Sequence, residues 1–259
     1  MMNVMKPVKK LWSLIASGDL QVVASSLSFT TILSIVPFFA VALSLISSLQ
    51  GLELLYPKVE GFILSYFQGP AGADGVWIVK RAFNKIQQGK IGSWGAVGLV
   101  LTSLLLVSEV DNAINRIWNL QGRRPLHKRL FLYWILLMAF PFILALMVAL
   151  ISVKSSLPAL ASVSSGTLQM IVLSAVLFCL YKVIPHTKVS TLSAFMGTFV
   201  GLGGLFLVTG SFQYLTEKFF NYNKLYGSIA AIPALLVWIL LIWYVILFGA
   251  AVSASFHRK

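Results

Sequence analysis

The sequence predicts an all-α integral membrane protein: a bundle of six transmembrane helices, with short amphipathic helices in the first outer loop. The composition is 58% hydrophobic and 10% charged, whereas soluble domains average about 45–50% apolar and about 25% charged residues. The 20 Lys and Arg residues give a net charge of +13 and fall almost wholly between apolar runs, where they act as topology signals and contact anionic lipid. These features exclude an ordinary soluble enzyme, and we expect residues 1–259 to form one membrane domain.

The chain begins with a basic, amphipathic segment, residues 1–26, which we expect at the cytoplasmic surface. Its apolar side chains fall on one helical face beside Lys residues, which suits a helix in the headgroup region. A solvated basic tail is the alternative. We expect the segment to be retained rather than cleaved, because Asp19 interrupts it and the apolar run from Leu27 exceeds the core of a signal peptide.

Six apolar runs approach or exceed the roughly 20 residues needed to cross a bilayer. They lie at about residues 27–49, 94–124 (apolar only in its first half), 130–153, 168–184, 192–214 and 229–254. Residues 51–91 contain two short amphipathic patterns around a Gly-Pro break, and we expect them to form an extracytoplasmic helical loop.

The distribution of basic residues predicts the orientation. An even number of spans places both termini on the same side, and 12 of the 20 Lys and Arg residues fall there. The other side carries most of its basic residues in the long first loop, which weighs less in the positive-inside rule than short loops do. Both termini are therefore predicted to be cytoplasmic.

The second span is unusual because it begins apolar at Trp94 and becomes polar from Glu109 without a helix-breaking residue. At 100° per residue, its polar side chains form two stripes. One stripe holds Glu109, Asn112 and Arg116, and the other holds Asp111, Asn115 and Trp118. At 1.5 Å per residue, the carboxylates lie roughly 22–26 Å from Trp94, in the inner third of the bilayer.

These polar stripes have three interpretations. They form a helix-end network that fixes packing, a gated polar site on a substrate path that titrates a proton, or a solvated membrane edge. Asn115 is one turn from Asp111 and can donate to its carboxylate, and Arg116 offers a compensating charge. A substrate path would also include Ser34 and Pro37 of the Ser-rich first span, whose hydroxyls suit close helix packing equally well.

Basic residues around the third span are predicted to contact anionic lipid headgroups at the cytoplasmic rim: Arg123, Arg124, Lys128 and Arg129. The dispersal of the 20 Lys and Arg residues along the whole chain argues against nucleic acid as a partner. In the fifth span, Gly197 and Gly201 have the small-xxx-small spacing that allows close helix packing. A homo-oligomer is compatible with this sequence.

Enzyme chemistry finds little support in the sequence. The three histidines, His127, His186 and His257, each lie at the end of a span, where they read as interfacial residues. No metal-ligand spacing, phosphate-binding glycine loop or nucleophile elbow appears, and the single Cys179 rules out an internal disulfide. We therefore expect no catalytic residue, metal or cofactor.

Several residues, spread in order over nearly the whole chain, carry a family resemblance. They are Leu33 to Pro37, Asp111, Asn115, Ile117, Trp118, Tyr133, Trp134, Pro141, Tyr181, Pro185, Tyr226, Gly227, Pro233, Trp238, Gly249 and Ala250. With them the chain resembles the YihY/BrkB family of bacterial inner-membrane proteins, whose older members were labelled ribonuclease BN. The resemblance implies a six-helix fold with cytoplasmic termini and favours Asp111 and Asn115 as site residues. Family members commonly carry an acid directly after the Gly-Ala pair, where this chain has Ala251.

The resemblance also implies a function. Association of the family with serum resistance, virulence and tolerance of envelope-lipid defects suggests that it moves or accommodates a lipid. We expect an inner-membrane transporter or lipid-handling protein for an anionic amphiphile. A non-transporting scaffold or envelope assembly factor is the alternative, and ribonuclease activity ranks third because the chain offers neither a soluble catalytic domain nor metal ligands.

Overall fold

The computed structural model describes residues 18–48, 57–61, 64, 80–81, 84, 93–120, 125–153, 165–219 and 231–257. Residues 1–17 of the predicted amphipathic segment 1–26, most of the outer loop 51–91, and Arg123 and Arg124 lie outside the described residues. All regular secondary structure in the described part is helical, which confirms the all-α prediction. The long helices are α2 (Asp19–Ser48), α4 (Ser93–Ile117), α5 (Leu126–Val153), α7 (Ser165–Val183), α8 (Thr191–Phe219) and α9 (Ala231–Phe256).

Four of these helices contain stretches long and apolar enough to cross a membrane. The stretches are His127–Ala149, Gly166–Val183, Thr191–Phe212 and Pro233–Phe256, in α5, α7, α8 and α9. Large apolar side chains stand exposed along them, including Phe131 and Phe199, as expected of helices whose outer faces meet lipid. Among the described residues, α2 and α4 do not meet the same criteria.

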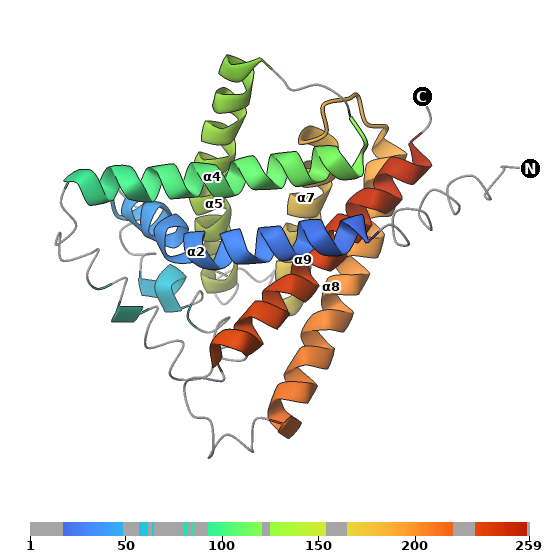
Figure 1. Cartoon of the computed structure of the whole chain (residues 1–259). Helices are drawn as coiled ribbons and strands as arrows, with labels where there is room; N and C mark the ends of the chain where they lie inside the picture. The colour runs from blue at the N-terminus through green and yellow to red at the C-terminus, as the bar shows by residue number, and fades with distance from the viewer. Residues whose placement is uncertain are drawn as a thin grey trace, which may run out of the picture.

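The helices do not form six parallel rods. In Figure 1, α2 and α4 lie side by side and run across the view, whereas α5 and α7 run vertically and α8 and α9 slope. The start of α5, the end of α7, the start of α8 and the end of α9 all lie at the upper end of this view. We call this the polar end, because the site described below lies there.

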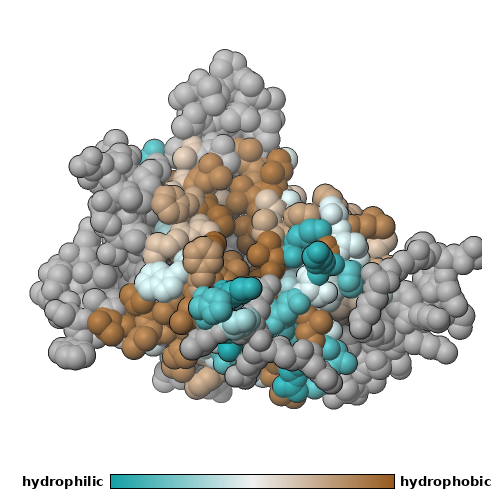
Figure 2. All heavy atoms as spheres, turned by 90° about the horizontal axis from the view of Figure 1, so that it is seen from above, coloured by the Kyte–Doolittle hydropathy of each residue, from teal (hydrophilic) through white to brown (hydrophobic). Residues whose placement is uncertain are grey.

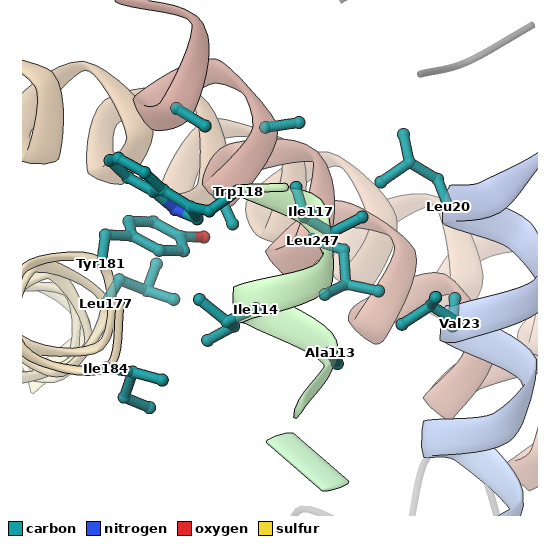
Figure 3. Close-up of a cluster of buried hydrophobic side chains, with 14 of the residues drawn as sticks. Leu20, Val23, Ala113, Ile114, Ile117, Trp118, Leu177, Tyr181, Ile184 and Leu247 are labelled. Carbon is teal, nitrogen blue, oxygen red and sulfur yellow. The ribbon is translucent and has the colours of Figure 1, made fainter. Parts of the chain in front are cut away.

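The second half of α4 is the centre of the packing. Figure 3 shows Ile114 and Ile117 of α4 lying between α2 and α7, with Leu247 of α9 beside them. Ile114 and Leu247 are 0% exposed. A helix that is apolar on its inner face and surrounded by three others excludes both lipid and water from that face.

Helix α2 begins earlier than predicted. The expected span starts near residue 27, but the helix starts at Asp19, so residues 19–26 belong to it rather than to a surface segment. The reason is an apolar stripe with helical spacing, formed by Leu20, Val23, Ala24 and Leu27, all of which are buried in the core.

Helix α4 ends in a Schellman motif. Asn119 adopts a φ of 52°, the left-handed conformation that Asn tolerates better than most residues. The amide of Leu120 donates to the Asn115 carbonyl (3.1 Å) and that of Asn119 to the Arg116 carbonyl (2.9 Å). These bonds satisfy the last carbonyls of α4 and turn the chain away from the core.

Candidate functional site

Asp111 is the hub of a buried polar cluster at the polar end. Only 1% of it is exposed. Its Oδ1 accepts a hydrogen bond from Asn115 Nδ2 (2.8 Å) and lies 3.2 Å from His186 Nε2. Its Oδ2 contacts the Tyr133 hydroxyl (3.0 Å) and lies 3.6 Å from Arg129 Nε. One carboxylate thus joins α4, α5 and the segment between α7 and α8.

Arg129 is the cation of this cluster, and it points inward. One terminal nitrogen donates to Asn112 Oδ1 (2.8 Å) and Ser108 Oγ (3.1 Å), while Nε donates to the Tyr133 hydroxyl. The side chain is only 14% exposed. The assignment of Arg129 to lipid headgroups is therefore corrected: Arg129 and Tyr133 are one turn apart on the face of α5 that packs on α4.

His186 completes the cluster from the segment between α7 and α8. Besides the contact of Nε2 with Asp111, its backbone amide donates to Asn115 Oδ1 (2.8 Å). Asn115 therefore uses both ends of its amide, one on Asp111 and one on this segment. Treating His186 as an interfacial residue missed this contact, since the two partners are 75 residues apart and no local pattern connects them.

The side chains of the other stripe of the second span, Glu109, Asn112 and Arg116, lie in three different surroundings. Arg116 pairs with Asp19 of α2 (2.9 Å) in an exposed ion pair, so the expectation that it compensates the acids of its own helix is wrong. Five residues after Asp111, it points to another side of α4. Asn112 joins Arg129 as described, and Glu109 is half-buried.

Trp118 lies just beyond α4 and is buried at 6% exposure. Its indole ring sits 5.5 Å from the imidazole of His257, measured between ring centroids. It therefore lies at the polar end but packs with the core rather than with Asp111.

The hydroxyl residues of α2 satisfy their own helix. Ser25, Ser28, Thr30 and Thr31 donate to carbonyls four residues earlier. Ser34 is buried and Pro37 lies inside α2, half-buried. Since the hydrogen atoms of those four hydroxyls are engaged, they favour the helix-packing interpretation over a polar path.

Gly197 and Gly201 lie at a close contact inside the chain. A Cβ at Gly197 would stand 2.7 Å from the Gly249 carbonyl oxygen, and one at Gly201 would stand 2.8 Å from the Tyr181 hydroxyl. That hydroxyl donates to the Ile246 carbonyl (2.8 Å). The small residues therefore let α7, α8 and α9 approach one another.

The surface of the polar end is mixed. Figure 2, which looks onto it, shows hydrophilic side chains gathered beside apolar ones. Lys128 and Lys188 are exposed, and Lys182 is held by the Val189 carbonyl (2.6 Å) and Thr191 Oγ1 (3.0 Å). Among the described residues, no three His, Cys, Asp or Glu side chains are arranged to hold a metal ion.

Residues 11–259 match the family described as Virulence factor BrkB. The chain belongs to this family. This chain is 33% identical over 241 residues to a UPF0761 membrane protein of Bordetella petrii, and the match covers 90% of this chain and 53% of the relative. It is also 33% identical over 247 residues to a UPF0761 membrane protein of Ralstonia nicotianae, covering 90% and 54%.

A shorter relative, a UPF0761 membrane protein of Vibrio vulnificus, is 31% identical over 244 residues, which cover 91% of this chain and 77% of the relative. The chain thus spans about half the length of the first two relatives. No solved structure matches it. The predicted family is confirmed, and the protein is a membrane protein.

Proposed function

We propose that this protein is an inner-membrane transporter that moves an anionic amphiphile out of the cytoplasmic leaflet, with the Asp111 cluster as its cytoplasmic gate. The observation that carries the proposal is the burial of an Asp111–Arg129 pair in a membrane protein. Ionisable groups buried within membrane-spanning bundles are costly, and they commonly mark substrate and ion pathways.

The arrangement of the cluster suits a gate. Asp111 is contacted from α5 by Tyr133 and Arg129, and from the segment between α7 and α8 by His186. Three elements far apart in sequence thus meet on one carboxylate. Movement of α5, or of the segment between α7 and α8, away from α4 would expose the charged side chains beside the lipid. The contacts on Asp111 hold this gate closed.

The proposed topology adds α2 and α4 to the four apolar helices, making six spans with both termini in the cytoplasm. At 30 and 25 residues, both are long enough to cross the hydrocarbon layer. Because they lie across the four apolar helices (Figure 1), six spans require α2 and α4 to be strongly tilted in the bilayer. Lys128 near the start of α5, Lys182 near the end of α7 and Lys188 between α7 and α8 belong to the elements of the polar end, which supports its placement on the cytoplasmic side.

A scaffold role is the second candidate, and one observation favours it. Both oxygens of Asp111 have protein partners, so the cluster can serve to fix helix packing alone. Polar residues that bond across helices stabilise membrane proteins without any transport.

Lipid movement in proteoliposomes separates the two candidates. The assay measures translocation of a fluorescent phosphatidylglycerol, with a fluorescent phosphatidylcholine for comparison. We expect Asp111→Asn to speed phosphatidylglycerol movement about tenfold to a hundredfold, because it weakens the contacts that hold the gate closed. This factor is the equivalent of about 1.5–3 kcal/mol for one charge-assisted hydrogen bond. A milder variant, Ser108→Ala, removes one partner of Arg129 and keeps every charge.

Asp19→Asn is the matched control, because it removes a carboxylate from the exposed pair with Arg116. It should leave translocation unchanged. Thermal unfolding of each variant shows whether a changed rate of lipid movement reflects loss of fold. Lipid movement that is absent from the wild type, or unchanged in Asp111→Asn, would remove the transporter proposal and leave the scaffold.

A further inference from the structure

His186 has one ring nitrogen without a partner. Its Nδ1 is buried and makes no hydrogen bond with the protein, whereas its Nε2 lies on Asp111 and its backbone amide is held by Asn115. Buried polar atoms almost always find a partner, so an unpaired one calls for a ligand, a water or a function.

The charges of the cluster indicate which kind of ligand atom could bind His186 Nδ1. Asp111 contributes one negative charge and Arg129 one positive charge, so the pair is balanced while His186 is neutral. A second proton on His186 adds an uncompensated charge and a buried N–H at Nδ1 that lacks an acceptor, which is costly. An anionic oxygen placed on Nδ1 removes both penalties.

We propose that His186 Nδ1 receives an anionic oxygen of a lipid headgroup, and that this binding takes up one proton from the cytoplasmic water. The inference rests on the proposed function, for which it names the contact atom and the substrate class. Nε2 keeps its bond to Asp111, and the new N–H at Nδ1 donates to the headgroup. Imidazole is suited to this step because it changes charge near neutral pH.

The surroundings favour an amphiphile over a soluble anion. The α5 part of the polar cluster adjoins exposed apolar side chains. Leu130 directly follows Arg129 and Trp134 directly follows Tyr133, and these two side chains are exposed by 43% and 45%. A headgroup bound at His186 would place its acyl chains toward this side of α5.

Other titratable and charged groups surround His186 at the polar end. They are Asp111 on α4, Arg129 and Tyr133 on α5, Lys182 at the end of α7, Lys188 in the same segment, and His257 at the end of α9. Lys182 is engaged by Val189 and Thr191, and His257 Nδ1 accepts from the Ser190 amide (3.4 Å). Of these titratable and charged groups at the polar end, His186 is the one that both contacts Asp111 and has a ring nitrogen without a partner.

Calorimetric titration of the full chain in detergent tests the inference. Short-chain phosphatidylglycerol is titrated in two buffers of different ionisation enthalpy, which yields the number of protons taken up. We expect close to one proton per lipid in the upper part of the imidazole range, and an affinity that falls by up to about tenfold per pH unit as the pH rises. Short-chain phosphatidylcholine and inorganic phosphate are the comparison ligands.

His186→Gln keeps a donor for Asp111 but cannot take up the proton, and we expect it to abolish proton uptake and weaken binding at least about tenfold. His127→Gln, at an exposed position of α5, is the matched control and should behave like the wild type. The pH dependence of the wild type tests the inference even if His186→Gln fails to fold.

The outcomes separate this inference from the proposed function. Proton-coupled binding without lipid movement in proteoliposomes would support the site and refute the transporter. Lipid movement with no proton uptake, or with uptake retained in a folded His186→Gln variant, would refute the site alone. Inorganic phosphate that binds with the same proton uptake and affinity as phosphatidylglycerol would overturn the assignment to a lipid headgroup.

Discussion

Replacing Arg129 by Met should destabilise the protein strongly, because it leaves the Asp111 carboxylate buried without its cation. The two charged groups are 3.6 Å apart, and at an effective dielectric constant of about 20 their attraction is about 5 kcal/mol. Removing one partner of a buried ion pair typically costs about 3–5 kcal/mol. Both side chains are at least 86% buried (14% and 1% exposed), so solvent screening reduces this cost little.

The assay is thermal unfolding in detergent. At about 2–4 °C per kcal/mol for a chain of this size, the Tm should fall by about 6–20 °C. The second arm is the double variant Arg129→Met with Asp111→Asn, which removes the uncompensated charge as well. It should recover at least half of the loss, since a neutral pair no longer carries the penalty of a buried charge.

Two results would refute this reasoning. A fall in Tm below about 2 °C for Arg129→Met would mean that Asp111 reaches water or another cation, contrary to its burial. Additive losses in the double variant would mean that the two side chains stabilise the protein independently rather than as a pair.

Three further predictions concern packing and capping, each measured by Tm. Gly249→Ala should destabilise the protein by about 1–3 kcal/mol, because a Cβ would overlap the Tyr181 hydroxyl. Gly203→Ala is the control and should leave the stability unchanged, because nothing lies within 4 Å of a Cβ there. Equal Tm values for the two variants would contradict the close contact at Gly249. Tyr181→Phe removes the hydrogen bond to the Ile246 carbonyl and should cost about 1 kcal/mol, an expectation that an unchanged Tm would rule out. Asn119→Val should cost about 1–2 kcal/mol because φ is 52°, whereas Asn119→Gly should be tolerated; a stable Val variant would show that the turn relaxes.

Helical periodicity was sufficient to place the polar half of the second span. Spacing alone puts Asp111 and Asn115 on one face, and the structure joins them with a hydrogen bond of 2.8 Å on the buried side of α4. It was not sufficient to choose the cation. Arg116 is near in sequence but meets α2, and Arg129 is more distant but meets Asp111.

The function of the site depends on contacts that no local pattern could reveal. Tyr133 and His186 are 22 and 75 residues from Asp111, and the local sequence around neither of them points to that carboxylate. Only the way α4 crosses α5 and meets the segment after α7 turns these side chains into partners.

The sequence by itself determined the all-helical membrane class, the family and the buried face of α4, because composition and a 3.6-residue period are local properties of the chain. Tertiary structure decided which charge compensates Asp111, which histidine reaches it, and that α2 and α4 lie across the other helices. The physical reason is that a helix face can be read from spacing, whereas the partner opposite that face is set by how whole helices pack.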